Sequence, residues 1–191
     1  MNIPAHNIRG FTLIEVLVSV AIFSVVMTIA LGALLAMSES DRKAQTLKSV
    51  INNLNFSLDS LSRAARIGTN YHCDASVGTF STPRDCAVTP ASSFAFQAGD
   101  SSTTYFCLGN SSTCSTTGTA ILRSIAGGAL VPITSGEVRI SSLNFYVTGS
   151  SSADALQPKV TILVSGTVVV SGTQTSQFNL QTSVTQRVYD Q

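Results

Sequence analysis

Hydrophobic residues are distributed along this chain in two different ways. From Val16 to Ser38 there are 23 consecutive residues without a charge, most of them Val, Ile, Leu, Ala or Met. A helix of that length extends about 35 Å, which is enough to cross a hydrocarbon core about 30 Å thick. Ser19, Ser24 and Thr28 can donate to carbonyl groups of the preceding turn, so they do not prevent insertion. The pattern predicts a membrane-spanning helix.

The helix is predicted to continue beyond the apolar run. Charged residues cluster between Glu39 and Lys48. Apolar residues then recur every three or four positions, at Leu47, Val50, Leu54, Leu58, Leu61 and Ala65. This spacing is typical of an amphipathic helix that packs on a following domain or forms a coiled coil, and its short extent favours packing on a domain. Gly68, preceded by Arg63 and Arg66, is the expected end of the helix.

Beyond Gly68 the pattern becomes that of short strands and turns. Ser and Thr make up 38 of the 123 residues from Thr69 to Gln191. The expected strands are Ser93–Gln97, Thr104–Leu108, Ala120–Ile125, Val138–Val147, Val160–Ser165 and Thr167–Ser171. Gly166 is interpreted as a tight connection between the last two. A final strand would place alternate residues on the core, namely Phe178, Leu180, Thr182, Val184 and Val188.

These patterns together predict the fold class and exclude several functions. The class is α+β, with a long N-terminal helix packed against a C-terminal antiparallel sheet. Charged residues make up only 11% of the 191 residues and the net charge is +1, so no basic field is present to hold nucleic acid. Histidine occurs only at positions 6 and 72, and the acidic residues are scattered. We therefore expect no catalytic site, no cofactor and no nucleic-acid partner.

Four cysteines lie in the strand-rich part of the chain. Their positions are 73, 86, 107 and 114. Sequence alone allows three connectivities, of which we favour the local pairs Cys73–Cys86 and Cys107–Cys114. A zinc site that includes His72 is the alternative, but no two of the cysteines have the spacing of a zinc knuckle. We expect two structural disulfides and no metal.

The residues before the apolar run determine what kind of membrane segment it is. A secretory signal peptide would have a small-residue cleavage site after the run, and none is present. Instead, Gly10–Val18 has the sequence GFTLIEVLV. This segment resembles the class III prepilin signature of type IV pilins and type II secretion pseudopilins, in which a glycine, a glutamate at fixed distance and a membrane span occur in register. The alternative is a plain signal anchor that keeps its N-terminus.

The resemblance implies how the chain is divided and processed. In that family a prepilin peptidase in the membrane cuts after the glycine and methylates the new amino terminus, which places cleavage between Gly10 and Phe11. The resulting parts are a leader (1–10), a membrane-spanning assembly half of the helix (11–38), an amphipathic half (39–68) and a disulfide-stapled β-rich head (69–191). The implied partners are the peptidase, other pilin or pseudopilin subunits and the cytoplasmic membrane. The leader would be cytoplasmic and the head extracytoplasmic, before incorporation into a periplasmic or extracellular filament.

Glu15 is the expected assembly residue. It lies at the start of the apolar helix, about 6 Å along the axis from Phe11. A carboxylate near hydrocarbon is costly and requires a partner. After cleavage the new amine of Phe11 could supply that partner between neighbouring, staggered helices. The alternative is that Glu15 only neutralises the positive helix N-terminus.

The position of the cysteines suggests which kind of subunit this is. A major pilin of the family usually carries one disulfide loop close to its C-terminus, whereas these cysteines lie between residues 73 and 114. We therefore expect a minor pilin or minor pseudopilin that joins or primes a type IV pilus or a type II secretion pseudopilus. The alternative is a monomeric membrane-anchored extracellular β-domain that binds a ligand, retains its leader and tolerates loss of Glu15.

Overall fold

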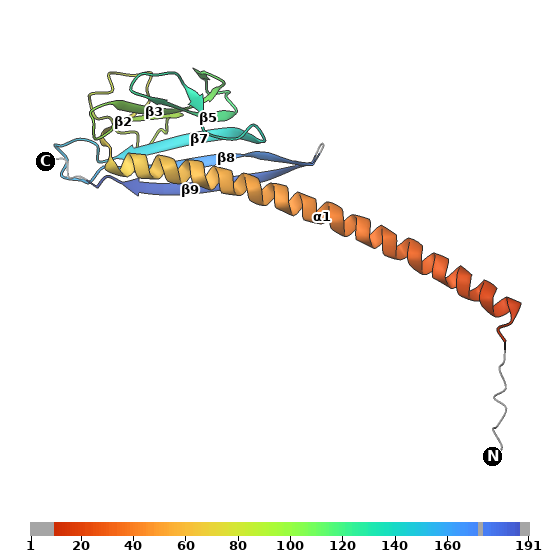
Figure 1. Ribbon diagram of the computed structural model, residues 1–191. Helices are drawn as coiled ribbons and strands as arrows, with labels where there is room; N and C mark the ends of the chain where they lie inside the picture. Colours follow the sequence, from red (N-terminus) through yellow and green to blue (C-terminus); the bar gives the residue numbers. More distant parts are fainter. Residues whose placement is uncertain (1–9, 172–173, 188–191) are drawn as a thin grey trace, which may run out of the picture. The chain divides into compact units, whose positions relative to one another are not determined.

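The computed structural model describes residues 10–171 and 174–187 and divides the chain into two compact units. The first unit ends at Ala44 and the second begins at Gln45. One helix, α1 (Leu13–Ile67), is followed by nine described strands, β1 to β9, all paired antiparallel (Figure 1). This confirms the α+β class. The leader before Gly10 and the predicted core residue Val188 lie outside the described residues.

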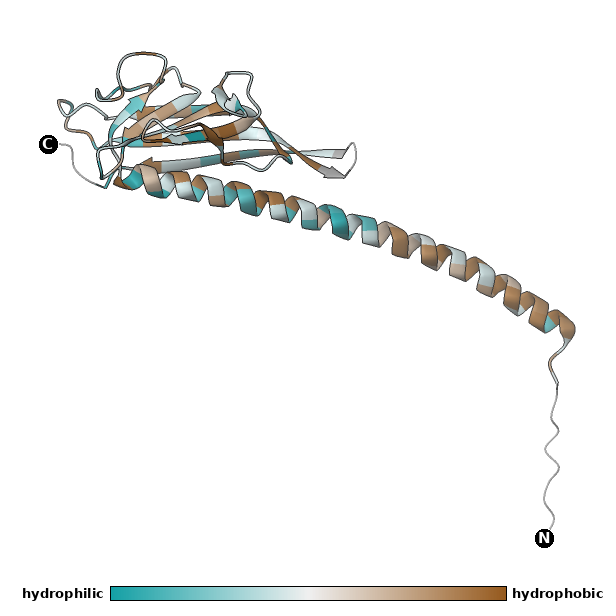
Figure 2. Cartoon of the chain, turned by 45° about the horizontal axis from the view of Figure 1, so that its top comes forward, coloured by the Kyte–Doolittle hydropathy of each residue, from teal (hydrophilic) through white to brown (hydrophobic). Residues whose placement is uncertain are grey.

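The first unit is an apolar helical segment without a core of its own. Every residue from Gly10 to Arg42 is exposed, including Phe11 at 82%. Within the described residues, α1 is the one helix that is long and apolar enough to cross a membrane. Figure 2 shows the N-terminal half of α1 as almost continuously hydrophobic. Such a surface is unfavourable in water and is stabilised when lipid or other protein covers it.

Three hydroxyl groups in this apolar segment are satisfied within the helix. The Ser19 hydroxyl donates to the Glu15 carbonyl oxygen at 2.7 Å, and the Ser24 hydroxyl donates to the Val20 carbonyl oxygen at 2.8 Å. The Thr28 hydroxyl donates to the carbonyl oxygen of Ser24 at 2.8 Å. These contacts confirm the expectation that the hydroxyl groups donate to carbonyl groups of the preceding turn.

In the second unit α1 is amphipathic. Its buried residues are Val50, Leu54, Ser57, Leu58, Leu61 and Ala65. They confirm the predicted stripe that packs on a following domain, with Leu47 only half-buried. The helix ends before Gly68, as expected, but Gly68 is not in the left-handed region. A Cβ atom there would lie 2.3 Å from Cδ2 of Phe96, so close packing of Phe96 requires the glycine.

The strands form two antiparallel sheets. The first sheet has the order β1 (Thr69–Cys73), β2 (Ser93–Gln97), β3 (Thr103–Asn110), β5 (Ala120–Ile125) and β6 (Val131–Pro132), with β4 (Thr113–Cys114) paired to β3. The second sheet has the order β7 (Val138–Thr148), β8 (Lys159–Ser171) and β9 (Gln174–Thr185). The second half of α1 runs alongside β8 and β9 (Figure 1).

Aromatic side chains join the two sheets into one hydrophobic core. The Tyr71 ring meets the Phe94 ring edge-on at 5.2 Å, and the Phe94 ring stacks on Phe145 of the second sheet at 5.5 Å. All three side chains are fully buried. The buried stripe of α1 belongs to the same core. The second unit therefore has the packed interior that the first unit lacks.

The second sheet corrects one prediction from the sequence. Val160–Ser165 and Thr167–Ser171 are not two strands joined by a turn, because both lie in the continuous strand β8. Gly166 pairs with Phe178 in β9. A Cβ atom at position 166 would lie 2.4 Å from the carbonyl oxygen of Arg139 and 2.8 Å from Cζ of Phe178. The glycine marks a close approach within a strand and not a turn.

The C-terminal strand follows the predicted alternation. In β9, Phe178, Leu180 and Thr182 are half-buried and Val184 is buried. The sequence analysis did not predict β1, β4 or β6. The strands β4 and β6 have only two residues each, which is too short for an alternation to be recognised. The strand β1 has five residues and begins two residues after α1 ends, and its burial does not alternate because Tyr71, His72 and Cys73 are all buried.

Candidate processing and assembly site

The candidate site lies at the start of α1, where Thr12 caps the helix. The backbone N–H of Glu15 donates to the Thr12 carbonyl oxygen at 3.1 Å and contacts Thr12 Oγ1 at 3.4 Å. A threonine followed by a glutamate three residues later is the sequence of a capping box. The sequence analysis missed this signal. It explains why the helix begins at Leu13, between Phe11 and Glu15.

The structure gives no internal reason for glycine at position 10. Gly10 is exposed, its φ is not in the left-handed region, and a Cβ atom there would meet nothing within 4 Å. Gly10 and Phe11 both precede the helix, so the peptide bond between them is exposed. An exposed bond outside regular structure is accessible to a peptidase. Recognition of the bond by an enzyme would account for the glycine where the fold does not.

The carboxylate of Glu15 has no partner within the described chain. Glu15 is exposed, and among residues 10–171 and 174–187 no side chain forms an ion pair with it. Glu39, further along α1, behaves differently because its carboxylate lies 2.8 Å from Lys43 Nζ. The hydrogen bond and charge of Lys43 lower the pKa of Glu39 below its ordinary value. Glu15 is therefore an exposed acidic group among apolar residues that has no ion-pair partner in the described part of the chain.

The two disulfides are the pairs expected from the sequence. Cys73 is bonded to Cys86, with Cα atoms 5.9 Å apart, and Cys107 is bonded to Cys114, with Cα atoms 5.8 Å apart. Cys73 and Cys107 are buried. All four cysteines are thereby paired, so none is free to bind zinc. Among the described residues, no three His, Cys, Asp or Glu side chains converge as metal ligands would.

Acidic side chains in the second unit hold loops in place. Asp85 accepts hydrogen bonds from the backbone N–H groups of Gly149 and Ser150, at 3.0 and 2.9 Å. Asp100 accepts from both the hydroxyl and the N–H of Ser102, and these bonds lower its pKa. An open cavity of about 580 Å³ lies beside the disulfide of β3 and β4, and half of the residues that line it carry a hydroxyl group. These groups serve the local backbone and present no paired acid and base.

The comparison with known protein families bears on the N-terminal segment. Residues 5–31 match the family model described as the prokaryotic N-terminal methylation motif. The matched range contains the candidate site, from Gly10 to Glu15, and the first part of α1. No curated protein and no solved structure matches the chain.

The motif and the long apolar helix point to one class of protein. They support a type IV pilin-like protein that carries the prepilin processing signal. Proteins with this motif are structural subunits, and the motif implies processing by a prepilin peptidase and assembly with other pilins. Together with the exposed apolar helix it indicates anchoring in a membrane and later placement in a filament.

Proposed function

We propose that this chain is a minor pilin or minor pseudopilin that is cut between Gly10 and Phe11, methylated on Phe11, and added to or used to prime a filament. One observation carries the proposal. An exposed glycine that the fold does not need lies in register with an unpartnered glutamate on an exposed apolar helix. A membrane anchor alone accounts for the apolar helix, and capping of the helix start accounts for a glutamate at position 15, but neither accounts for the glycine. A processed filament subunit explains them together.

Assembly would supply the missing partner of Glu15. Cleavage creates one new cation in the apolar region, the amine of Phe11. Within a single helix that amine and Glu15 are both at the same helix start, whereas two staggered helices can bring the amine of one chain to the carboxylate of the next. In a low-dielectric setting, removing one member of such a pair is strongly destabilising because it leaves an uncompensated charge. Glu15 would thus couple processing to assembly.

Two features of the second unit support a minor role over a major one. One disulfide joins β1 to the loop that follows it and the other joins β3 to β4, so both lie well before the C-terminus, whereas a major pilin of the family usually has one disulfide loop near its end. The head also contains two separate sheets on one helix. We infer that the head is specialised for a single position in a filament, at its tip or in an initiating complex.

The proposed topology follows from the processing step. The leader 1–10 would lie in the cytoplasm, residues 11–38 would cross the cytoplasmic membrane, and the amphipathic segment 39–68 with the head 69–191 would lie outside it. The final location would be a type IV pilus or a type II secretion pseudopilus. The partners would be the prepilin peptidase and other pilin or pseudopilin subunits.

The competing function is a monomeric membrane-anchored module whose β-rich head binds a ligand. The open polar cavity beside Cys107 and Cys114 is the observation in its favour. Such a module would use residues 11–38 only as an anchor. It would keep its leader, and replacement of Glu15 would leave its behaviour unchanged.

The two functions are separated by comparing Glu15→Gln with Glu39→Gln in a host that carries an active prepilin peptidase and pilin subunits. Both substitutions remove one carboxylate charge from α1, but Glu39 has a partner in Lys43 and lies beyond the proposed span. The assembled fraction of each variant is measured by crosslinking to other pilins and by isolating filaments. Intact mass shows whether each variant is cleaved.

We expect Glu15→Gln to be cleaved normally but to fall at least about tenfold in the assembled fraction, equivalent to about 1.4 kcal/mol or more. Glu39→Gln should assemble like the unmodified chain. Equal assembly of the two variants would contradict the assigned role of Glu15. A chain that keeps its leader and never crosslinks to another pilin would favour the monomeric module.

A further inference from the structure

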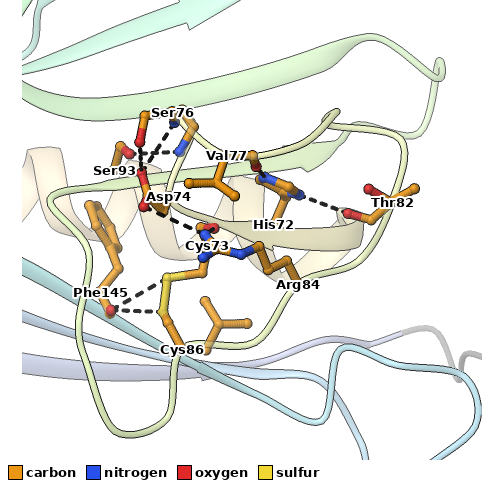
Figure 3. A network of polar contacts seen from close by, with 12 residues as sticks. His72, Cys73, Asp74, Ser76, Val77, Thr82, Arg84, Cys86, Ser93 and Phe145 are labelled. Atoms are coloured by element: carbon orange, nitrogen blue, oxygen red, sulfur yellow. Dashed lines mark hydrogen bonds and ion pairs between the residues drawn. A yellow bond between two sulfur atoms is a disulfide. The ribbon is translucent and has the colours of Figure 1, made fainter.

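The imidazole of His72 is buried between two carbonyl groups of the same loop. His72 lies in β1, directly before Cys73, and is 1% exposed. Its Nδ1 is 2.7 Å from the Thr82 carbonyl oxygen, and its Nε2 is 2.8 Å from the Val77 carbonyl oxygen. Figure 3 shows the two carbonyl groups on opposite sides of the ring. Both distances are those of normal hydrogen bonds.

The hydrogen-bonding capacity of imidazole makes this arrangement informative. A backbone carbonyl oxygen can only accept a hydrogen bond, so each contact requires an N–H on the ring. A neutral imidazole has one N–H and one lone pair, and it would direct that lone pair at the second oxygen. The imidazolium ion has two N–H groups and satisfies both oxygens. Burial makes a mismatched contact costly because water cannot replace the missing partner.

We propose that His72 is protonated in the folded protein and that its two N–H groups hold the loop between Cys73 and Cys86 closed. This pair of hydrogen bonds is called the His72 clasp. The loop opens when the ring loses one proton. The inference goes beyond the proposed filament function, because it concerns the head alone. The clasp is reversible, whereas the Cys73–Cys86 disulfide beside it is a permanent closure.

The clasp matters because the middle of the loop has few other attachments. Near the disulfide, the N–H of Cys73 donates to the Arg84 carbonyl oxygen at 3.0 Å, and the N–H of Arg84 donates to the Tyr71 carbonyl oxygen at 2.9 Å. Between Val77 and Thr82 the backbone hydrogen bonds join residues of the loop to one another, such as the Thr82 N–H to the Thr79 carbonyl oxygen. The two His72 contacts therefore join this exposed stretch to the sheet.

The loop also carries an aromatic group that would move with it. The Phe80 ring meets the His72 ring edge-on at 5.7 Å and lies 5.6 Å from the Tyr105 ring of β3. Release of the clasp would free Phe80 from both rings. Opening the loop would thus uncover the Tyr105 side of the first sheet.

The charged groups around the ring do not titrate in the same range. On the loop, the Asp74 carboxylate lies 3.5 Å from Arg84 Nη1, and hydrogen bonds from Ser76 lower the pKa of Asp74. On β3, burial raises the pKa of Tyr105, so its hydroxyl stays neutral. On β2, the residue opposite His72 is Ala95, which carries no charge. The proposed pH-dependent change in the loop is therefore assigned to the His72 ring and not to these neighbours.

The direction of the pH effect follows from the number of donors. The protonated ring makes both contacts, so the closed loop is stabilised at the acidic side of the His72 titration. That stabilisation is lost as the pH rises and the ring keeps only one N–H. The disulfide and the aromatic core have no part in this step, so the sheets should remain folded while the loop opens.

Nuclear magnetic resonance of the full chain in detergent micelles tests the proposal directly. The chain contains two histidines, so a His6→Gln background leaves His72 as the sole imidazole. Ring nitrogen signals show how many nitrogens carry a proton at each pH. Hydrogen exchange of the Val77–Thr82 amides, corrected for base catalysis and compared with amides of β8, shows when the loop opens.

We expect both ring nitrogens to carry protons while the loop is closed, and loop exchange to rise at least tenfold as one proton is lost. Asp74→Asn in the same background should keep this pH dependence, since Asp74 is not the titrating group. His72→Gln should exchange rapidly at every pH. A closed loop with a single protonated ring nitrogen would overturn the proposal, as would loop exchange that does not follow the His72 titration.

Discussion

The two halves of α1 have the same backbone conformation but opposite surroundings. From Leu13 to Ala44 large apolar side chains are exposed on all sides of the helix, and the hydroxyl groups donate to the helix itself. From Gln45 to Ile67 one stripe is buried in a core of two sheets, and the charged residues lie away from it. One continuous helix therefore provides two different surfaces. The distribution of apolar and charged residues around the helix distinguishes them.

The two halves also differ in where their stability comes from. The second half gains free energy by removing apolar area from water, about 25 cal/mol for each Å². The first half buries none of its large apolar side chains from Leu13 to Met37, so this apolar surface remains exposed. Substitutions that are identical in chemistry should therefore have different effects in the two halves.

The same substitution made in both halves should give the largest difference in the free energy of unfolding. Leu61 is 0% exposed and Leu31 is 60% exposed, and both lie on α1. We expect Leu61→Ala to lower the free energy of unfolding of the head by about 2–5 kcal/mol, because it removes buried methyl groups and leaves a cavity. Leu31→Ala should leave it unchanged within about 0.5 kcal/mol.

Tyrosine fluorescence during denaturation in detergent measures this difference. The chain has four tyrosines and no tryptophan, and all four tyrosines follow residue 70. The signal thus reports the second unit. Equal destabilisation by the two substitutions would mean that the first half of α1 also contributes to folding of the head.

Loss of a disulfide should have the next largest effect on the second unit. Cys73 and Cys86 are 13 residues apart in sequence. Replacing both with Ser should lower the free energy of unfolding by about 3 kcal/mol, because the unfolded chain gains conformational freedom. The same change at Cys107 and Cys114, which are 7 apart, should cost slightly less. Denaturation of the unmodified chain and of both variants, with and without reductant, checks these values. An unfolding midpoint of the unmodified chain that is the same with and without reductant would contradict them.

A smaller loss of stability is expected from a substitution in β8. Gly166→Ala would place a methyl group 2.4 Å from the carbonyl oxygen of Arg139, so we expect a loss of about 1–3 kcal/mol as the strand shifts. Gly99→Ala is the matched control, since a Cβ atom there meets nothing within 4 Å. Thermal unfolding of both variants gives the comparison. A neutral Gly166→Ala would contradict the conclusion that close approach to Arg139 and Phe178 requires a glycine in this strand.

Sequence patterns predicted those features whose signals are local and repeated. The uncharged run, the three-and-four spacing from Val50 to Ala65 and the strand alternation each repeat over several residues, so the α+β class could be predicted. The short spacing of each cysteine pair favoured the disulfides that the structure contains. At the candidate site, Gly10, Phe11 and Glu15 were found from the motif.

Features that depend on contacts between distant residues could not be predicted. A glycine at position 166 is compatible with a turn and also with a close approach to Arg139. Only the register of the strands distinguishes these two structures. The ring contacts of His72 are with backbone carbonyl groups, which leave no trace in the identity of residues 77 and 82. The missed cap at Thr12 is different, because its capping-box sequence was available to be read.

The intact mass of the protein from membranes of a host with active prepilin peptidase tests the central claim most directly. We predict a mass that lacks Met1–Gly10 and carries one additional methyl group, which would place the processed terminus at Phe11. An intact leader, in a host whose peptidase demonstrably cuts another prepilin, would contradict the account and leave an anchored β-rich domain.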